Sequence, residues 1–143
     1  MGKYNVERFI NAQNGEFEKA FSELKNGKKQ THWIWYIFPQ LRCLGRSPTA
    51  QYYGIENLEE AKAYCNNELL GGRYVQCCKV LEGLAQNNPV YIMGDIDALK
   101  LCSSLTLFYV ADEKNRGLYK GLIDKFYGGK FDALTLDHLK NLE

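Results

Sequence analysis

Residues 31–40 of the chain read Thr31-His32-Trp33-Ile34-Trp35-Tyr36-Ile37-Phe38-Pro39-Gln40. The β-branched and aromatic side chains of this run favour a β-strand. Thr31 would suit the N-cap of a helix, however, and Pro39 would suit its end. A strand also needs a partner, and Leu105–Val110 is the only other candidate strand. We therefore expect a helix here, while a two-stranded element stays open as the alternative.

Outside this run, apolar residues recur mostly at the spacing of amphipathic helices. The pattern predicts helices at residues 6–10, 17–24, 57–64, 69–84, 97–110, 116–127 and 135–142, with short ones that begin at Pro48 and Pro89. Typical helix ends are Asn26-Gly27 and Gly128-Gly129, and typical N-caps are Ser47, Asn57, Asp97 and Thr135. Because the gaps are short, the sequence predicts an all-α fold, a single compact domain of about seven to eight short helices over residues 1–143.

Composition narrows the class of protein. A chain of 143 residues with 45% hydrophobic and 24% charged residues suits one soluble globular domain. No stretch reaches the ~18 apolar residues of a membrane span, and the first residues lack an apolar signal core. We therefore expect a cytoplasmic protein without a membrane partner. The five cysteines include no Cys-x-x-Cys pair, so we expect no zinc site, no other metal and no cofactor.

Charge is distributed unevenly along the chain. No Asp or Glu occurs between Leu24 and Ile55, whereas this window holds five basic residues: Lys25, Lys28, Lys29, Arg42 and Arg46. The formal charge of the whole chain is +1, so the remaining residues are net acidic. Such an asymmetry creates a positive potential that attracts anions. A solvated basic loop without a specific partner is the alternative interpretation.

The aromatic run lies inside the same basic window and contains both tryptophans and one of the two histidines of the chain. A core helix with its rings packed inward is one interpretation. A continuous aromatic run is nevertheless too wide for one buried stripe, since in a helix Trp33 and Ile37 share a face that Trp35 does not. Some rings should therefore reach a surface or a cleft, where rings beside cations suit a ligand with a π-face and negative charge.

Two further segments carry polar groups. Gly45-Arg46-Ser47-Pro48 combines a guanidinium, a hydroxyl and a helix start, which together favour an anion site. In the second segment, Lys100, Ser103 and Ser104 fall within about one helical turn, with Thr106 behind them. Hydroxyl groups inside an apolar helix either bond to their own backbone or face a polar cavity, and the sequence leaves both possibilities open.

The sequence contains few candidate catalytic residues. His32 and His138 are the only histidines, and no particular carboxylate is marked as the orienting partner of His32. The sequence holds no paired-carboxylate spacing, no metal triad and no nucleophile elbow. These features support binding better than turnover.

Several strings together resemble a known family. They are Gly27–Leu41, Leu44-Gly45-Arg46-Ser47, Lys100–Phe108 and Phe126-Tyr127-Gly128-Gly129, with Val6–Phe9 and Ala12-Gln13 near the start. The chain resembles the domain-of-unknown-function family numbered 1810, which is similar in fold to an all-α mycobacterial hypothetical protein. The resemblance covers nearly the whole chain and implies a helical fold, but no assured activity. Thr31 and Tyr36 depart mildly from the usual pattern, in which serine and phenylalanine are frequent.

We therefore predict a small soluble protein that binds an anionic nucleotide-derived ligand, such as an ADP-ribose derivative or a cyclic nucleotide messenger, and sequesters it. The predicted ligand-binding residues are His32, Trp33, Trp35, Phe38, Gln40, Arg46, Ser47, Lys100, Ser103 and Ser104. One alternative is an enzyme acting on the same ligand class with His32 as acid or base. The second is a module for single-stranded nucleic acid or protein, against which the few positive charges argue. The oligomeric state is left open.

Overall fold

The computed structural model describes residues 4–142, and these form an all-α fold, as predicted. Ten α-helices occur in this part of the chain, against about seven to eight expected. They are α1 Glu7–Gln13, α2 Phe17–Lys25, α3 Ile34–Ile37, α4 Pro48–Tyr53, α5 Leu58–Asn66, α6 Glu68–Gly83, α7 Pro89–Met93, α8 Asp95–Ala111, α9 Arg116–Tyr127 and α10 Ala133–Leu142, with the 3-10 turns η1 Arg42–Leu44 and η2 Glu113–Asn115. Within residues 4–142, no helix is long and apolar enough to cross a membrane.

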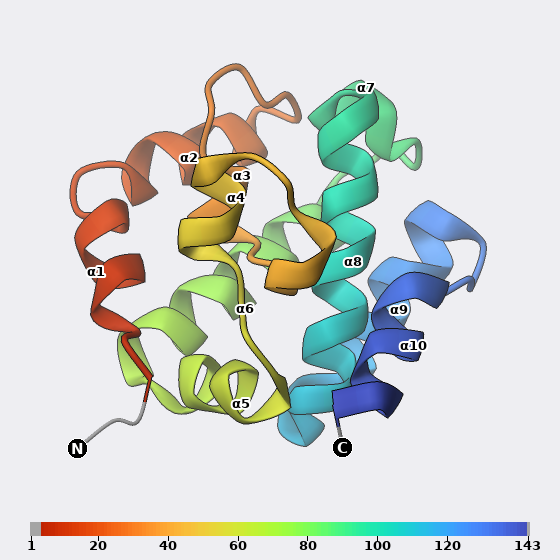
Figure 1. Cartoon of the computed structure of the whole chain (residues 1–143). Helices are drawn as coiled ribbons and strands as arrows, with labels where there is room; N and C mark the ends of the chain where they lie inside the picture. The colour runs from red at the N-terminus through yellow and green to blue at the C-terminus, as the bar shows by residue number, and fades with distance from the viewer. Residues whose placement is uncertain (1–3, 143) are drawn as a thin grey trace.

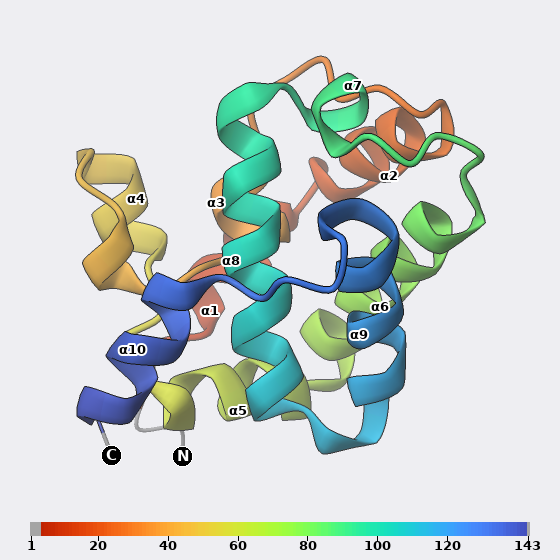
Figure 2. The same ribbon diagram turned by 90° about the vertical axis from the view of Figure 1, so that its right-hand side faces the viewer.

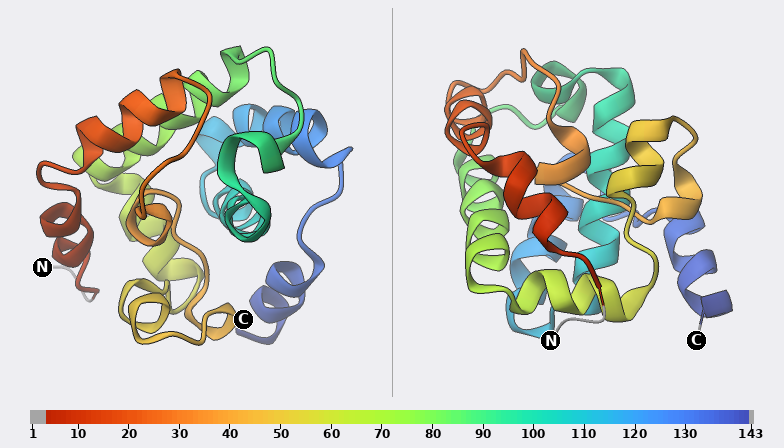
Figure 3. Two further views of the ribbon diagram at one scale, coloured as in Figure 1. Left: turned by 90° about the horizontal axis from the view of Figure 1, so that it is seen from above. Right: turned by 60° about the vertical axis from the view of Figure 1, so that its left-hand side comes forward.

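The long helix α8 is the centre of the molecule (Figure 1). It packs against α3, α5, α7, α9 and α10. Seen from above it runs nearly end-on through the middle of the other helices (Figure 3, left). Every residue from Leu101 to Phe108 is buried, which explains why this helix lacks an amphipathic pattern. The segment between α9 and α10 crosses α8, as Figure 2 shows, and brings α10 back toward η1.

The disputed aromatic run forms a single helical turn, α3. Trp33, Ile34, Ile37 and Phe38 are all buried, because one helical turn places these positions on the same face. The alternative partner strand, Leu105–Val110, lies within α8. A lone parallel bridge between Leu41 and Ile55 is the only β-pairing in the part of the chain described. The helical expectation is thus confirmed, although Thr31 does not cap α3 and Trp33 holds the N-cap position.

Most predicted helix ends are confirmed, and two predicted caps besides Thr31 are wrong. The side chains of Ser47, Asn57 and Asn88 accept hydrogen bonds from the backbones of the helices they precede. Gly128 ends α9 with φ of +62°, a left-handed conformation that glycine adopts freely. Asp97 lies inside the first turn of α8 instead of capping it, because its carboxylate is paired with Lys29.

Thr135, the other predicted cap, is the third residue of α10, and Asp132 caps this helix instead. The backbone N–H and the hydroxyl of Thr135 both donate to Asp132 Oδ2. The cap of α10 therefore lies three residues before the predicted one.

Glu23 anchors the loop between α2 and α3. Its carboxylate accepts hydrogen bonds from the Gln30 N–H (2.7 Å), from the N–H and hydroxyl of Thr31 (3.0 and 2.6 Å), and from Trp33 Nε1 (2.9 Å). Burial by itself would raise the pKa of this carboxyl, but the four hydrogen bonds favour the charged form more strongly and lower the pKa from its ordinary 4.5 to about 2.

This shift predicts a loss of stability in acid. Because the pKa of Glu23 is lower in the folded protein, its contribution is present above pH 4.5 and disappears as the pH falls toward about 2. The shift corresponds to roughly 3 kcal/mol in the free energy of unfolding. Urea unfolding of the wild type between pH 7 and pH 2.5 should show this loss, and Glu23→Gln should flatten the curve below pH 4.5. Parallel curves for the two proteins would contradict the assignment, and Glu18→Gln, an exposed change on the same helix, is the control.

Candidate binding cleft beside Trp35 and Lys100

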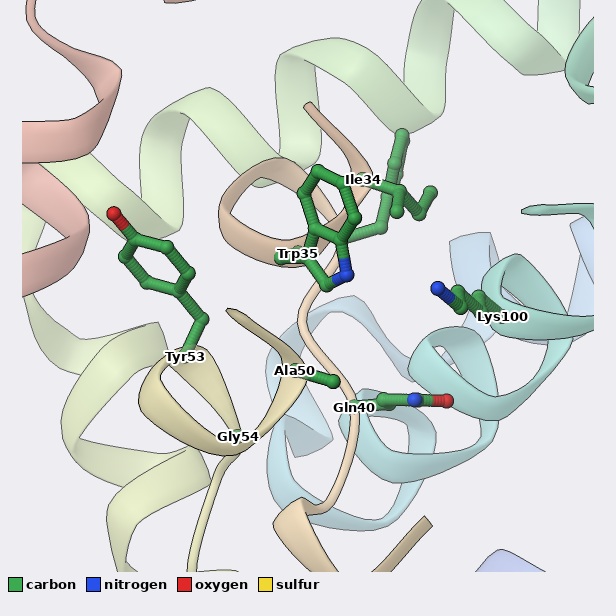
Figure 4. A pocket seen from close by; sticks show the side chains of 8 residues that line it. Ile34, Trp35, Gln40, Ala50, Tyr53, Gly54 and Lys100 are labelled. Carbon is green, nitrogen blue, oxygen red and sulfur yellow. The ribbon is translucent and has the colours of Figure 1, made fainter. Parts of the chain in front are cut away.

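A small cavity, named here the Trp35 cavity, lies between α3, α4 and α8 (Figure 4). Its lining residues are Ile34, Trp35, Phe38, Gln40, Ala50, Tyr53, Gly54 and Lys100. The volume is about 10 Å³, which is room for a single water molecule or one oxygen atom of a ligand. The cavity therefore suits a polar atom and is too small for a ring.

The indole of Trp35 presents an unsatisfied donor at this cavity. Trp35 Nε1 is buried and has no hydrogen-bond partner, the sole such side-chain atom found among the residues described. The ammonium of Lys100 lies 5.3 Å from the centre of the Trp35 ring. In Figure 4 the nitrogen edge of Trp35 and the end of the Lys100 side chain point toward one another, with Gln40 below them. Two donors thus converge where a buried N–H lacks an acceptor, which favours an oxygen atom between them.

A wider groove, named here the α8–α10 groove, adjoins the cavity and shares Gln40 and Lys100 with it. Its other lining residues are Leu44, Ile96, Leu99, Ser103, Asp132 and Leu134. The groove has a volume of about 400 Å³, within the range of small-molecule sites. Cavity and groove together form the candidate cleft, with aliphatic walls and a few polar groups.

The walls of the groove are unusually exposed aliphatic side chains. Ile96 is 69% exposed, Leu99 is 71% exposed and Leu134 is 60% exposed. Sequence reasoning missed these residues, although a signal existed, because positions 96, 99, 100 and 103 follow the i, i+3, i+4, i+7 spacing of one helix face. That face of α8 points out of the core, so its apolar residues are available to a ligand or partner.

The hydroxyl groups of α8 mainly secure the segment before α10. The Ser103 hydroxyl lies 3.2 Å from both the Leu99 carbonyl and Asp132 Oδ2. The Thr106 hydroxyl donates to the Cys102 carbonyl at 2.8 Å and accepts from the Asp132 N–H at 2.9 Å. The hydroxyls of Ser103 and Thr106 therefore both bond to the backbone of α8, which is one of the two possibilities that the sequence left open. Ser103 also lines the groove.

The structure brings five of the ten predicted site residues together and places the other five elsewhere. Trp35, Phe38, Gln40, Lys100 and Ser103 line the candidate cleft. Trp33 is 0% exposed and its N–H is bonded to Glu23, so its ring is part of the core and cannot stack on a ligand. Ser104 is also fully buried, at 2.8 Å from the Tyr74 hydroxyl.

His32, Arg46 and Ser47 are exposed and line neither hollow. The Ser47 hydroxyl accepts from the Ala50 N–H, which makes it a helix cap. The ten predicted ligand-binding residues therefore do not line one common cleft.

The basic window is also partly neutralised. Lys29 is paired with Asp97 at 2.8 Å, and Arg42 lies 3.6 Å from Glu56. Lys25, Lys28 and Arg46 stay exposed. Two of the five basic side chains are therefore paired, Lys29 with a residue distant in the sequence and Arg42 with the residue that follows the window.

The five cysteines have the character of unreactive thiols. Burial raises the pKa of Cys65 and of Cys77 to about 12, and burial next to the Asp132 charge raises that of Cys102 to about 11. The pKa values of Cys43 and Cys78 are raised by burial as well. At neutral pH these side chains are therefore protonated and poor nucleophiles. No group of three or more residues suited to hold a metal ion occurs within the described part of the chain.

Comparisons with known proteins agree with this fold. The chain is similar to the conserved hypothetical protein Rv1873 from Mycobacterium tuberculosis, whose crystal structure superposes with a TM-score of 0.94 at 41% sequence identity. The match covers 97% of this chain and 99% of the mycobacterial one. No curated protein matches the chain. A family model described as a protein of unknown function (DUF1810) matches residues 3–139. The chain therefore belongs to the DUF1810 family.

Proposed function

We propose that this protein binds a small anionic, nucleotide-derived ligand in the candidate cleft and sequesters it. The observation that carries the proposal is the buried, unpartnered Trp35 Nε1 beside the Lys100 ammonium. A buried donor without a partner costs about 1–3 kcal/mol, so an oxygen atom at this point stabilises the folded protein. In the free protein a water molecule would fill the position, and in the complex an oxyanion oxygen would replace it.

The groove supports a ligand with a flat, weakly polar body. Leu44, Ile96, Leu99 and Leu134 offer aliphatic surface on both α8 and the neighbouring elements. A base or sugar ring can lie against such side chains while its phosphate reaches Lys100. The proposal of sequestration rests on the chemistry of the cleft. Cys102, which precedes the groove residue Ser103, has a raised pKa and is therefore a poor nucleophile, and His32 does not line the cleft.

Substitution of Lys100 should weaken binding selectively. We expect Lys100→Ala to raise the Kd for a phosphate-bearing ligand about tenfold or more, because a charge-assisted contact is lost. Trp35→Phe keeps an aromatic ring but removes the indole N–H, and should raise the Kd severalfold. The matched control is Lys79→Ala on α6, an exposed lysine remote from the cleft.

Calorimetric titration of adenosine 5′-monophosphate, 3′,5′-cyclic adenosine monophosphate, ADP-ribose and inorganic phosphate provides the measurement. The expected result is binding of at least one nucleotide with a Kd below about 1 mM, weakened about tenfold or more in Lys100→Ala and unchanged in Lys79→Ala. A panel in which no compound binds below about 1 mM would overturn the proposal, and so would binding that Lys100→Ala leaves unchanged.

A further inference from the structure

Asp132, which caps α10, is held by hydrogen bonds from both α8 and α10. Its Oδ2 oxygen is contacted by the Ser103 hydroxyl at 3.2 Å, the Thr135 N–H at 3.0 Å and the Thr135 hydroxyl at 2.5 Å. Its backbone N–H donates to Thr106 Oγ1 at 2.9 Å. The position and rotation of the carboxylate are thus fixed by α8 on one side and α10 on the other.

All of these hydrogen bonds to the side chain use Oδ2. The other oxygen, Oδ1, accepts no hydrogen bond from any residue that the structure describes, while Asp132 lines the α8–α10 groove. An acceptor that is already fixed loses little conformational entropy when a ligand binds. The groove therefore combines a donor, the Lys100 ammonium, with a preformed acceptor, the Asp132 carboxylate.

We infer that Asp132 is a specificity-determining residue of the cleft, which accepts a hydrogen bond from a hydroxyl or amino group of the ligand. This inference rests on the proposed function and deepens it. The ligand carries an oxyanion at the end near Lys100 and Trp35, and a neutral hydrogen-bond donor at the other end. Its weakly polar middle lies against Leu99 and Leu134. The charge on Asp132 also disfavours the reversed orientation, since it repels an oxyanion placed beside it.

The choice of variants follows from the double role of Asp132 as cap and acceptor. Asp132→Asn keeps a carbonyl oxygen for the Thr135 N–H but places an amide NH₂ where Oδ1 stood, so the acceptor becomes a donor. Asp132→Ser keeps only the cap. Asp137→Asn, an exposed change on the same helix, is the matched control, and melting temperatures establish that each variant is folded.

The experiment titrates three related probes into each protein by calorimetry. Adenosine 5′-monophosphate has both donors, its 2′,3′-dideoxy form lacks the ribose hydroxyls, and inosine 5′-monophosphate lacks the amine. In the wild type and in Asp137→Asn, one of the two analogues should bind about tenfold or more weakly than adenosine monophosphate. In Asp132→Asn and Asp132→Ser this difference in Kd should disappear, because the oxygen that accepts the hydrogen bond from the ligand's hydroxyl or amine is absent.

The outcomes separate this inference from the proposal on which it rests. If adenosine monophosphate binds in a Lys100-dependent way but both analogues bind equally well, the role of Asp132 is overturned and the binding function stands. The role of Asp132 is also overturned if the discrimination persists in both folded Asp132 variants. If none of the three probes binds below about 1 mM, the inference and its parent proposal fail together.

Discussion

Glu23→Ala is expected to lower the free energy of unfolding by about 4 kcal/mol, one of the largest effects of any single substitution in this chain. The alanine would leave the Trp33 N–H buried without an acceptor, and it would release the two backbone N–H groups of Gln30 and Thr31. Equilibrium unfolding in urea at pH 7, followed by circular dichroism, measures the change.

A double-mutant cycle identifies the hydrogen bond that matters most. Trp33→Phe removes the indole N–H and should destabilise the wild type more than it destabilises Glu23→Ala, because the two residues share one interaction. Glu18→Ala should alter stability by no more than about 0.5 kcal/mol, since Glu18 is exposed on the same helix. Additive effects of the Glu23 and Trp33 changes would contradict this account.

Arg8→Met is expected to cost a similar amount, about 4 kcal/mol, because it leaves the carboxylate of Glu60 buried without its cation. Arg8 Nη1 lies 2.9 Å from Glu60 Oε2, and both side chains are at most 5% exposed. The guanidinium also donates to the carbonyl oxygens of Asn5, Tyr52 and Gly54. One side chain thus joins α1 to the end of α4 and to the start of α5.

A substitution of Glu60, the partner of Arg8, tests whether the orphaned buried charge causes this loss. The double variant Arg8→Met with Glu60→Gln should be more stable than Arg8→Met alone, since the orphaned buried charge is then absent. Arg42→Met breaks a much more exposed pair with Glu56 and should cost less than about 1 kcal/mol. A double variant that is less stable than Arg8→Met would show that geometry rather than charge burial dominates this cluster.

The helices were predictable wherever local signals determine them. Ser47, Asn57 and Gly128 act through neighbours in the sequence, and their caps form as predicted. The errors arise where a distant residue competes for the same group. Asp97 forms an ion pair with Lys29, and the Thr31 hydroxyl donates a hydrogen bond to Glu23, so neither side chain caps a helix. No periodicity in the sequence reveals such pairings.

The predicted site residues are likewise correct or wrong according to whether a distant residue competes for the same group. Trp35, Gln40 and Lys100 were predicted from ring content and charge, and they lie in the cleft. Trp33 was predicted from the same reasoning and lies in the core, because Glu23 supplies the acceptor that its N–H needs. Which of two similar rings reaches a cleft depends on one carboxylate ten positions earlier. Asp132 was missed because it reaches the groove only where the segment between α9 and α10 crosses α8 (Figure 2).

The central position of α8 has a consequence for synthesis on the ribosome. The surfaces of α3 and α5 that α8 covers belong to residues made well before it. At ordinary translation speeds, α8 emerges roughly 5–20 s after α1, and during that interval the surfaces of α3 and α5 that face α8 have no partner helix. The nascent chain is therefore exposed to misfolding and aggregation until α8 has left the exit tunnel, because only then can the core close around this helix.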